Sequence, residues 1–179
     1  MRLLSAGTPL RLLAAFVVAA ALLVQAGCDD GGRESPLRKN LPNEGDPAPD
    51  FTLRSFDGEE IALSTLKGSP VVLNFWASWC GPCRSEAEDL EKVWQEFRGS
   101  GVRFIGVAIQ DTEEKATAFI EEFGLTYPNG LDDSGEIAAA YKIYGVPKTF
   151  VIDRQGRFSY IHMGAIKAAI LVEAIKEVL

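Results

Sequence analysis

The residues best suited to chemistry are two cysteines, Cys80 and Cys83, separated by Gly81 and Pro82. An almost unbroken apolar run at residues 71–76 precedes the pair and helical spacing follows it, so the cysteines are expected at a helix N-terminus. The unpaired N–H groups and the positive dipole end there favour a thiolate on Cys80, and the thiolate is the form of sulfur that attacks disulfides. Pro82 suits a first turn because its missing N–H would have no helical partner. Cys83 lies one turn further along, so we expect it to be the more buried, resolving thiol.

Three other uses of the cysteine pair compete with redox cycling. A zinc site would need further N or S ligands, and the chain offers only Cys28 and His162 besides, so no metal is expected. An inert structural disulfide stays open, although a bridge that closes so short a loop stabilises little. A peroxidatic Cys80 is excluded, because peroxiredoxins carry Thr three residues and Pro seven residues before that cysteine, where this chain has Ala77 and Leu73.

The elements that must position the pair alternate between apolar strands and amphipathic helices. Periodicity and turn signals predict strands at 51–53 and 61–63 around an Asp57-Gly58 turn, at 71–76, 102–109, 127–131, 149–152 and 158–161, and helices at 81–98, 112–124, 134–142 and from 165 onward. This alternation indicates an α/β fold, a mixed sheet flanked by helices on both faces, to which the last hairpin adds antiparallel strands. The pattern does not determine the order of the strands.

Three stretches of the sequence resemble the TlpA/ResA-type, thioredoxin-like oxidoreductases of the bacterial cell envelope. They are residues 45–51 (GDPAPDF), 74–84 (NFWASWCGPCR) and 145–150 (GVPKTF). The resemblance implies a thioredoxin fold with an N-terminal β-hairpin and a central insertion near residues 112–131. It also implies thiol–disulfide exchange with no cofactor beyond the Cys80–Cys83 disulfide.

The resemblance assigns further residues to the surroundings of the disulfide. In thioredoxin-like folds a cis-proline packs against the active-site disulfide, and Pro147 matches it. A proline that begins a strand leaves the backbone of Val146 free to pair with an extended substrate segment, so Val146 and Pro147 are predicted to bind substrate. An ordinary turn proline is the alternative. Trp79 is expected to pack near the disulfide and to contact substrate as well. Trp76 is expected to pack around the disulfide.

Glu86 is the remaining candidate catalytic residue. It follows Cys83 by one helical turn, in line with apolar positions of the predicted helix, so burial should raise its pKa and allow it to exchange a proton with Cys83. Thioredoxins place a buried Asp six residues before the first cysteine, where this chain has Asn74, whereas ResA-type proteins carry a functional Glu at the position of Glu86. The alternative is that Glu86 only complements the helix dipole, which is worth ~0.5 kcal/mol.

The N-terminal segment has the pattern of an export signal. Thirteen uncharged, mostly apolar residues at 12–24 follow two arginines, which is too short to span a membrane but fits a signal peptide. Small residues before Cys28 resemble a bacterial lipobox, although Gln25 replaces its usual Leu. The sequence therefore predicts a signal peptide at 1–27, a lipidated tether at 28–49 rich in Pro and Gly, and a thioredoxin-like domain at 50–179. The protein is expected in the cell envelope, on the periplasmic side, anchored to a membrane through Cys28.

Composition limits the partners. The chain has 179 residues, a formal net charge of −7 and 24% charged residues, and this acidic balance argues against nucleic-acid binding. The resemblance implies protein disulfide substrates such as apocytochrome c, and a membrane electron donor of the CcdA/DsbD type. Gly81-Pro82 resembles the thioredoxin dipeptide and favours a reductant. A DsbA-like oxidase and a non-catalytic binding module stay open, and a monomer is expected.

Overall fold

The computed structural model describes residues 41–179. The predicted signal peptide at 1–27 and the predicted lipidation site Cys28 lie outside the described residues, and both stay predictions. Within the described part of the chain, none of the helices combines the length and the apolar character needed to cross a membrane.

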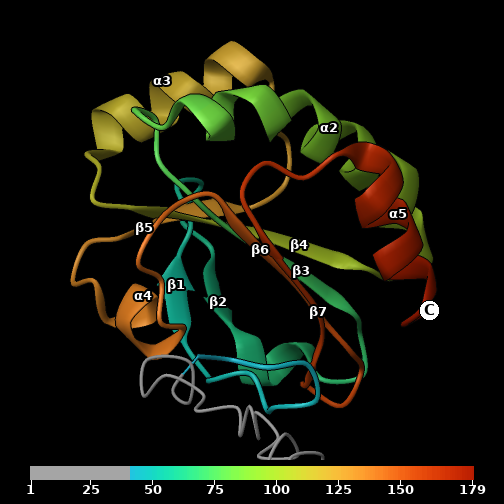
Figure 1. Ribbon diagram of the computed structural model, residues 1–179. Helices are drawn as coiled ribbons and strands as arrows, with labels where there is room; N and C mark the ends of the chain where they lie inside the picture. The colour runs from blue at the N-terminus through green and yellow to red at the C-terminus, as the bar shows by residue number, and fades with distance from the viewer. Residues whose placement is uncertain (1–40) are drawn as a thin grey trace, which may run out of the picture. The chain divides into compact units, whose positions relative to one another are not determined.

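A five-stranded mixed sheet forms the centre of the domain (Figure 1). Its strands, in the order in which they lie side by side, are β5 (Asn129–Asp132), β4 (Arg103–Ile109), β3 (Val71–Trp76), β6 (Lys148–Ile152) and β7 (Phe158–Met163). β3, β4 and β5 are parallel, whereas β6 and β7 run antiparallel to their neighbours. The predicted thioredoxin-like, mixed α/β sheet is confirmed, and the structure supplies the strand order that the sequence pattern leaves undetermined.

Helices cover one face of the sheet and a mixed layer covers the other (Figure 1). The first face carries α2 (Gly81–Phe97, continued by the 3-10 turn η3, Arg98–Ser100), α3 (Glu113–Phe123) and α5 (Ala168–Lys176). The second carries α4 (Glu136–Ala140) and the segment around the N-terminal hairpin, with the ring of Tyr141 at the centre of an aromatic cluster. Every residue of β3 is buried, because its alternate side chains enter the two cores.

The N-terminal hairpin closes one edge of the sheet. Its strands, β1 (Thr52–Arg54) and β2 (Glu60–Ala62), pair antiparallel around the predicted Asp57-Gly58 turn and lead into η2 (Leu63–Leu66). Just after β1, Ser55 forms an antiparallel bridge with Gly130 of the edge strand β5, and the Phe56 N–H donates to the Asn129 carbonyl at 2.8 Å. The hairpin thus pairs with itself and with the main sheet.

Two predicted boundaries need correction. The predicted tether extends through residue 49, but the backbone of residues 45–48 is hydrogen-bonded to the start of β7, because extended Pro- and Gly-rich backbone can still pair with a strand. These bonds run from Gly45 N to Phe158 O (2.7 Å), from Ala48 N to Gly156 O (2.9 Å) and from Phe158 N to Asp46 O (3.0 Å). The last helix begins at Ala168 rather than near residue 165, since Lys167 is still extended and the Ile166 N–H donates to a side chain of α2.

Candidate active site

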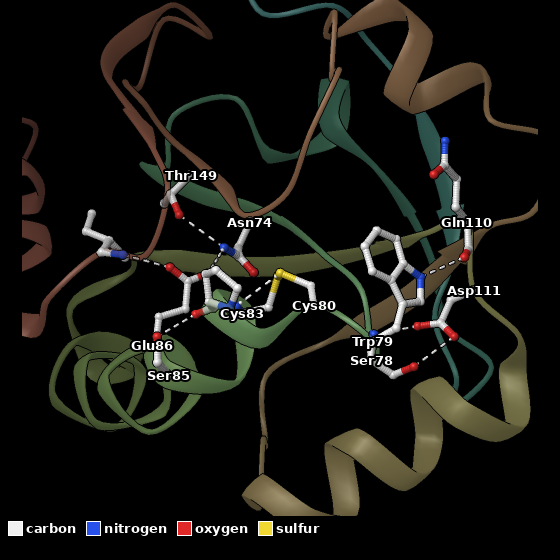
Figure 2. Close-up of a disulfide and its surroundings, with 12 residues drawn as sticks. Asn74, Ser78, Trp79, Cys80, Cys83, Ser85, Glu86, Gln110, Asp111 and Thr149 are labelled. Carbon is white, nitrogen blue, oxygen red and sulfur yellow. Dashed lines mark hydrogen bonds between the residues drawn. A yellow bond between two sulfur atoms is a disulfide. The ribbon is translucent and has the colours of Figure 1, made fainter.

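The two cysteines lie where β3 gives way to α2, as predicted, and form a disulfide (Figure 2). Cys80 is the N-cap of α2, and its Sγ accepts a hydrogen bond from the Cys83 N–H at 3.1 Å. Their exposed fractions are 4% and 2%, so Cys83 is only slightly the more buried. Trp76 belongs to the same buried cluster as the two cysteines, and its ring stacks on Phe119. The Cys80 sulfur, which caps the helix, is therefore the one that accepts a hydrogen bond from the first turn.

Asp111 holds the loop that leads into the disulfide. Its carboxylate accepts hydrogen bonds from the Ser78 N–H at 2.6 Å, from the Ser78 hydroxyl at 2.9 Å and from the Thr112 N–H at 2.9 Å. The sequence pattern identified Asp111 only as part of a helix cap, and the cap residue itself is Thr112. A usable signal was its place two residues after the end of β4, since neighbouring parallel strands end at the same edge of a sheet.

Trp79 stands beside the disulfide with 59% of its surface exposed. Its indole N–H donates to the Gln110 carbonyl at 3.0 Å, so the ring is fixed against the loop that follows β4 (Figure 2). Gln110 has a φ of +50°, a left-handed conformation that few non-glycine residues adopt. A large aromatic surface is thereby presented to solvent next to Cys80.

The predicted cis-proline is confirmed, because the Val146–Pro147 peptide bond is cis. Pro147 directly precedes β6, whose first residue Lys148 pairs with Phe75 of β3 near the end that leads to Cys80. The Pro147 carbonyl accepts from the Gly164 N–H at 3.0 Å, and Val146 is half-buried. The Val146–Pro147 step thus leads into the strand beside β3, the strand that precedes the cysteines.

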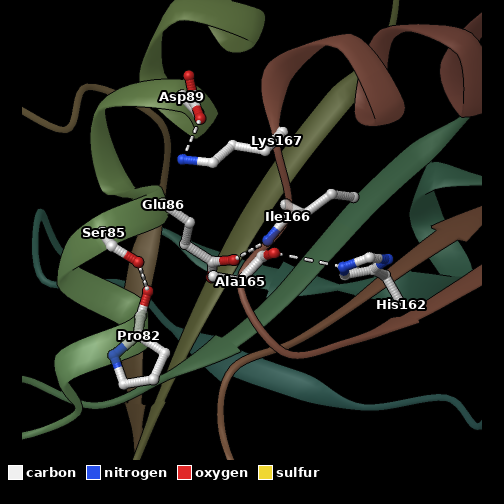
Figure 3. Close-up of polar contacts among 8 residues, drawn as sticks. All are labelled: Pro82, Ser85, Glu86, Asp89, His162, Ala165, Ile166 and Lys167. Carbon is white, nitrogen blue, oxygen red and sulfur yellow. Dashed lines mark hydrogen bonds and ion pairs between the residues drawn. The ribbon is translucent and has the colours of Figure 1, made fainter.

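Glu86 is buried, with 1% of its surface exposed. One carboxylate oxygen accepts from the Asn74 side-chain amide at 2.9 Å and the other from the Ile166 N–H at 2.7 Å (Figures 2 and 3). Burial raises the pKa of Glu86 to about 7, against the lowering effect of the two hydrogen bonds, and the nearby charge of Asp89 raises it further. The predicted burial is therefore confirmed, and the group changes its charge near neutral pH.

Other polar residues around Glu86 have structural partners (Figure 3). The Lys167 ammonium lies 3.4 Å from the Asp89 carboxylate, which joins the segment before α5 to α2. His162 contacts the Tyr160 hydroxyl at 3.2 Å and the Ala165 carbonyl at 3.4 Å. Among residues 41–179, no three His, Cys, Asp or Glu side chains are grouped closely enough to hold a metal ion.

This arrangement is suited to thiol–disulfide exchange, and known proteins that resemble the chain carry names of that activity. The AhpC/TSA family matches residues 44–161. The thiol-disulfide oxidoreductase ResA of Oceanobacillus iheyensis is 38% identical over 126 residues, which cover 68% of this chain and 66%, just under two thirds, of that protein. The thiol-disulfide oxidoreductase ResA of Bacillus subtilis is 31% identical over 133 residues, which cover 74% of each chain.

Solved structures give the same picture of the fold. A thiol:disulfide interchange protein of the thioredoxin family from Chlorobium tepidum superposes with a TM-score of 0.68 at 30% identity, over 74% of this chain and 94% of that one. StoA from Bacillus subtilis superposes with a TM-score of 0.63 at 27% identity, over 71% of this chain and 96% of that one. The similarity thus extends over most of the described domain.

Proposed function

This chain belongs to the AhpC/TSA family and is a thiol–disulfide oxidoreductase of the ResA type, and from that premise we propose that it reduces protein disulfides in the cell envelope. The observation that carries the proposal is the Cys80–Cys83 disulfide at the start of α2, with the buried Glu86 one turn beyond Cys83. The family name does not imply peroxidase activity here, because Ala77 and Leu73 occupy the positions where peroxiredoxins carry Thr and Pro.

The first step is the attack of reduced Cys80 on a substrate disulfide. The Cys80 thiolate forms a bond to one substrate sulfur, the substrate S–S bond breaks, and the departing substrate thiolate takes up a proton. The N-cap position supports the negative charge on Cys80 before the attack, because the Cys83 N–H already points at its sulfur.

The second step releases the reduced substrate. Cys83 loses its proton to the Glu86 carboxylate, and the resulting thiolate attacks the Cys80 sulfur. The Cys80–Cys83 bond forms, the mixed disulfide breaks, and the second substrate thiolate departs, so the substrate gains the two electrons that the dithiol loses. A proton acceptor whose pKa is about 7 is matched to this task near neutral pH.

Trp79, Val146 and Pro147 are proposed to bind the polypeptide around the target disulfide. Trp79 supplies exposed aromatic surface beside Cys80, and the Val146–Pro147 step precedes the strand next to β3. An extended substrate segment can pair with backbone at such a step while its cystine lies over the cysteine pair. Gly81 and Pro82, predicted as the active-site loop, form the first turn of α2 between the two cysteines.

The setting and partners of the reaction follow from the sequence resemblance. Lipidation of Cys28 would hold the domain at a membrane, and a membrane dithiol donor of the CcdA/DsbD type would restore the reduced cysteines. Apocytochrome c is the proposed substrate. The names of the ResA relatives support the redox activity, and the lipobox-like residues before Cys28 support the anchoring.

Trapping of substrates tests the proposal. Cys83→Ala keeps the attacking thiolate and removes the resolving thiol, so covalent complexes through Cys80 should accumulate in cells and can be identified by mass spectrometry. Cys80→Ala is the matched control and should trap no protein. Complexes that form in Cys80→Ala instead would reverse the assigned roles. If the wild-type protein neither reduces insulin with dithiothreitol nor forms any mixed disulfide, a binding module replaces the proposed enzyme.

A further inference from the structure

We infer that Asn74 is a positioning residue, whose side-chain amide holds the Glu86 carboxylate and thereby sets the pH range in which Cys83 can give up its proton. The inference rests on the proposed role of Glu86 as proton acceptor. Asn74 acts only through Glu86.

The geometry places Asn74 between three elements. It lies on β3, six residues before Cys80, with 2% of its surface exposed. Its Nδ2 donates to Glu86 Oε1 at 2.9 Å and to Thr149 Oγ1 at 3.0 Å (Figure 2). Both protons of the amide nitrogen are thus used, and the carboxylate of Glu86, which only accepts, determines that the nitrogen end of the amide faces it. The side chain connects β3 with α2 and with β6.

The hydrogen bonds favour the charged form of Glu86. Each carboxylate oxygen accepts from a group that cannot lose its proton at ordinary pH, the Asn74 amide on one side and the Ile166 N–H on the other. A protonated Glu86 would have to place its O–H against one of these donors and lose that bond. Asn74 therefore opposes the effect of burial, which on its own favours the neutral form.

The other charged and titratable groups near Glu86 come from several elements. Asp89 of α2 raises the pKa of Glu86 and is itself paired with Lys167. Tyr127, between α3 and β5, is buried, and burial together with the Glu86 charge raises the pKa of its hydroxyl. His162 of β7 lies one step away, through the Ala165 carbonyl. None of these four side chains donates a hydrogen bond to the Glu86 carboxylate, so Asn74 is the side chain that does.

The same amide links Glu86 to the strand that follows the cis-proline. Thr149, the second acceptor, lies two residues after Pro147 on β6, and the other donor, Ile166, lies in the segment between β7 and α5. Asn74 and Glu86 together therefore connect α2 with both segments. The two hydrogen bonds that its amide donates distinguish Asn74 from a residue that only packs against α2.

The test measures the resolving step as a function of pH. The reduced protein is mixed with 5,5′-dithiobis(2-nitrobenzoic acid), whose first thionitrobenzoate leaves when Cys80 attacks and whose second leaves when Cys83 resolves the mixed disulfide. Asn74→Leu removes the donor to Glu86. The midpoint of the pH profile of the second-phase rate should therefore move upward by about one pH unit. Thr149→Val removes the other bond of the same amide and should leave the midpoint unchanged. Glu86→Gln should abolish the Glu86-dependent inflection.

The outcomes separate this inference from the proposed function. An unchanged midpoint in Asn74→Leu, with a changed profile in Glu86→Gln, overturns the role of Asn74 and leaves Glu86 in place. An unchanged profile in Glu86→Gln overturns the role of Glu86 itself. If Asn74→Leu does not fold, Asn74→Asp serves instead: two adjacent carboxyls share one proton, so its profile should show two inflections rather than one. A single inflection at the wild-type pH in that variant contradicts the inference.

Discussion

Glu86 couples the ionisation of one side chain to the stability of the whole domain. Its pKa is about 7 in the folded protein because of burial, compared with an ordinary value of 4.5. The folded state therefore holds this proton more tightly than the unfolded chain. The protonated Glu86 therefore contributes about 3 kcal/mol to the free energy of unfolding. This stabilisation is fully present below about pH 4.5 and is lost as the pH rises through about 7.

We therefore expect the free energy of unfolding of the oxidised wild-type protein to fall between pH 4.5 and pH 8 relative to that of Glu86→Gln. Urea denaturation at several pH values measures both. Glu88→Gln, on the exposed side of the same helix, is the matched control and should follow the wild type. Parallel curves for wild type and Glu86→Gln would mean that the carboxyl of Glu86 has an ordinary pKa.

How far the site could be predicted differs from residue to residue. Glu86 could be found from the sequence, because an acid in line with apolar positions of a helix must be buried. Its partners could not: Asn74 and Ile166 lie 12 and 80 positions away, and only the packing of β3, α2 and the last loop brings them together. Asp111 was missed for the same reason, since its contact with Ser78 spans 33 positions.

At the level of elements, Gly106 of β4 leaves room for two side chains of the neighbouring strands β3 and β5. A Cβ at Gly106 would overlap the Asn129 side-chain oxygen and would lie 2.9 Å from Trp76 Nε1. Those two side chains are hydrogen-bonded to each other at 3.0 Å. The Trp76–Asn129 hydrogen bond across β4 therefore depends on the missing methyl group at residue 106.

Gly106→Ala should lower the free energy of unfolding by ~2–3 kcal/mol, because the methyl group forces strain or breaks the Trp76–Asn129 hydrogen bond. Thermal and urea denaturation measure the change. Gly99→Ala is the control, since a Cβ at Gly99 meets nothing within 4 Å, and its stability should stay near that of the wild type. Equal stability of the two variants would show that Asn129 can move away at little cost.

The element predictions succeeded where the periodicity was strong and failed at ends set by distant contacts. Residues 71–76 are a strand with the predicted bounds, since a run of apolar residues buried on both faces has one clear interpretation. The last helix starts three residues later than predicted because the Ile166 N–H bonds to Glu86 instead of beginning the helix. No local pattern could indicate that preference.

On the scale of the whole molecule, residues 45–49, which precede β1, are part of the folded domain. Residues 45–48 exchange backbone hydrogen bonds with the start of β7, and the Tyr141 hydroxyl donates to the Pro49 carbonyl at 2.7 Å. Composition indicated a tether here, since Pro and Gly exclude a regular helix, but it does not reveal pairing with a remote strand. The folded domain thus begins closer to the N-terminus than residue 50.

A chain that begins at residue 50 should therefore be less stable than one that begins at residue 41, by about 3 kcal/mol for the lost backbone hydrogen bonds. The comparison uses urea denaturation of both purified domains. A chain that begins at residue 44 keeps every bond to residues 156 and 158 and should match the longer one. If the chain that begins at residue 50 is equally stable, these contacts contribute nothing measurable.

The N-terminal hairpin also bears on self-association. A sheet with an unpaired outer strand can recruit the backbone of another molecule and seed aggregates. β5 and β7 are the two outer strands of the main sheet among the described residues. The Ser55–Gly130 bridge pairs the hairpin with the outer edge of β5. For a protein proposed to reduce disulfides of other chains, this bridge blocks one edge of the sheet against addition of a substrate strand, and disruption of the hairpin should show first as turbidity in concentrated solution.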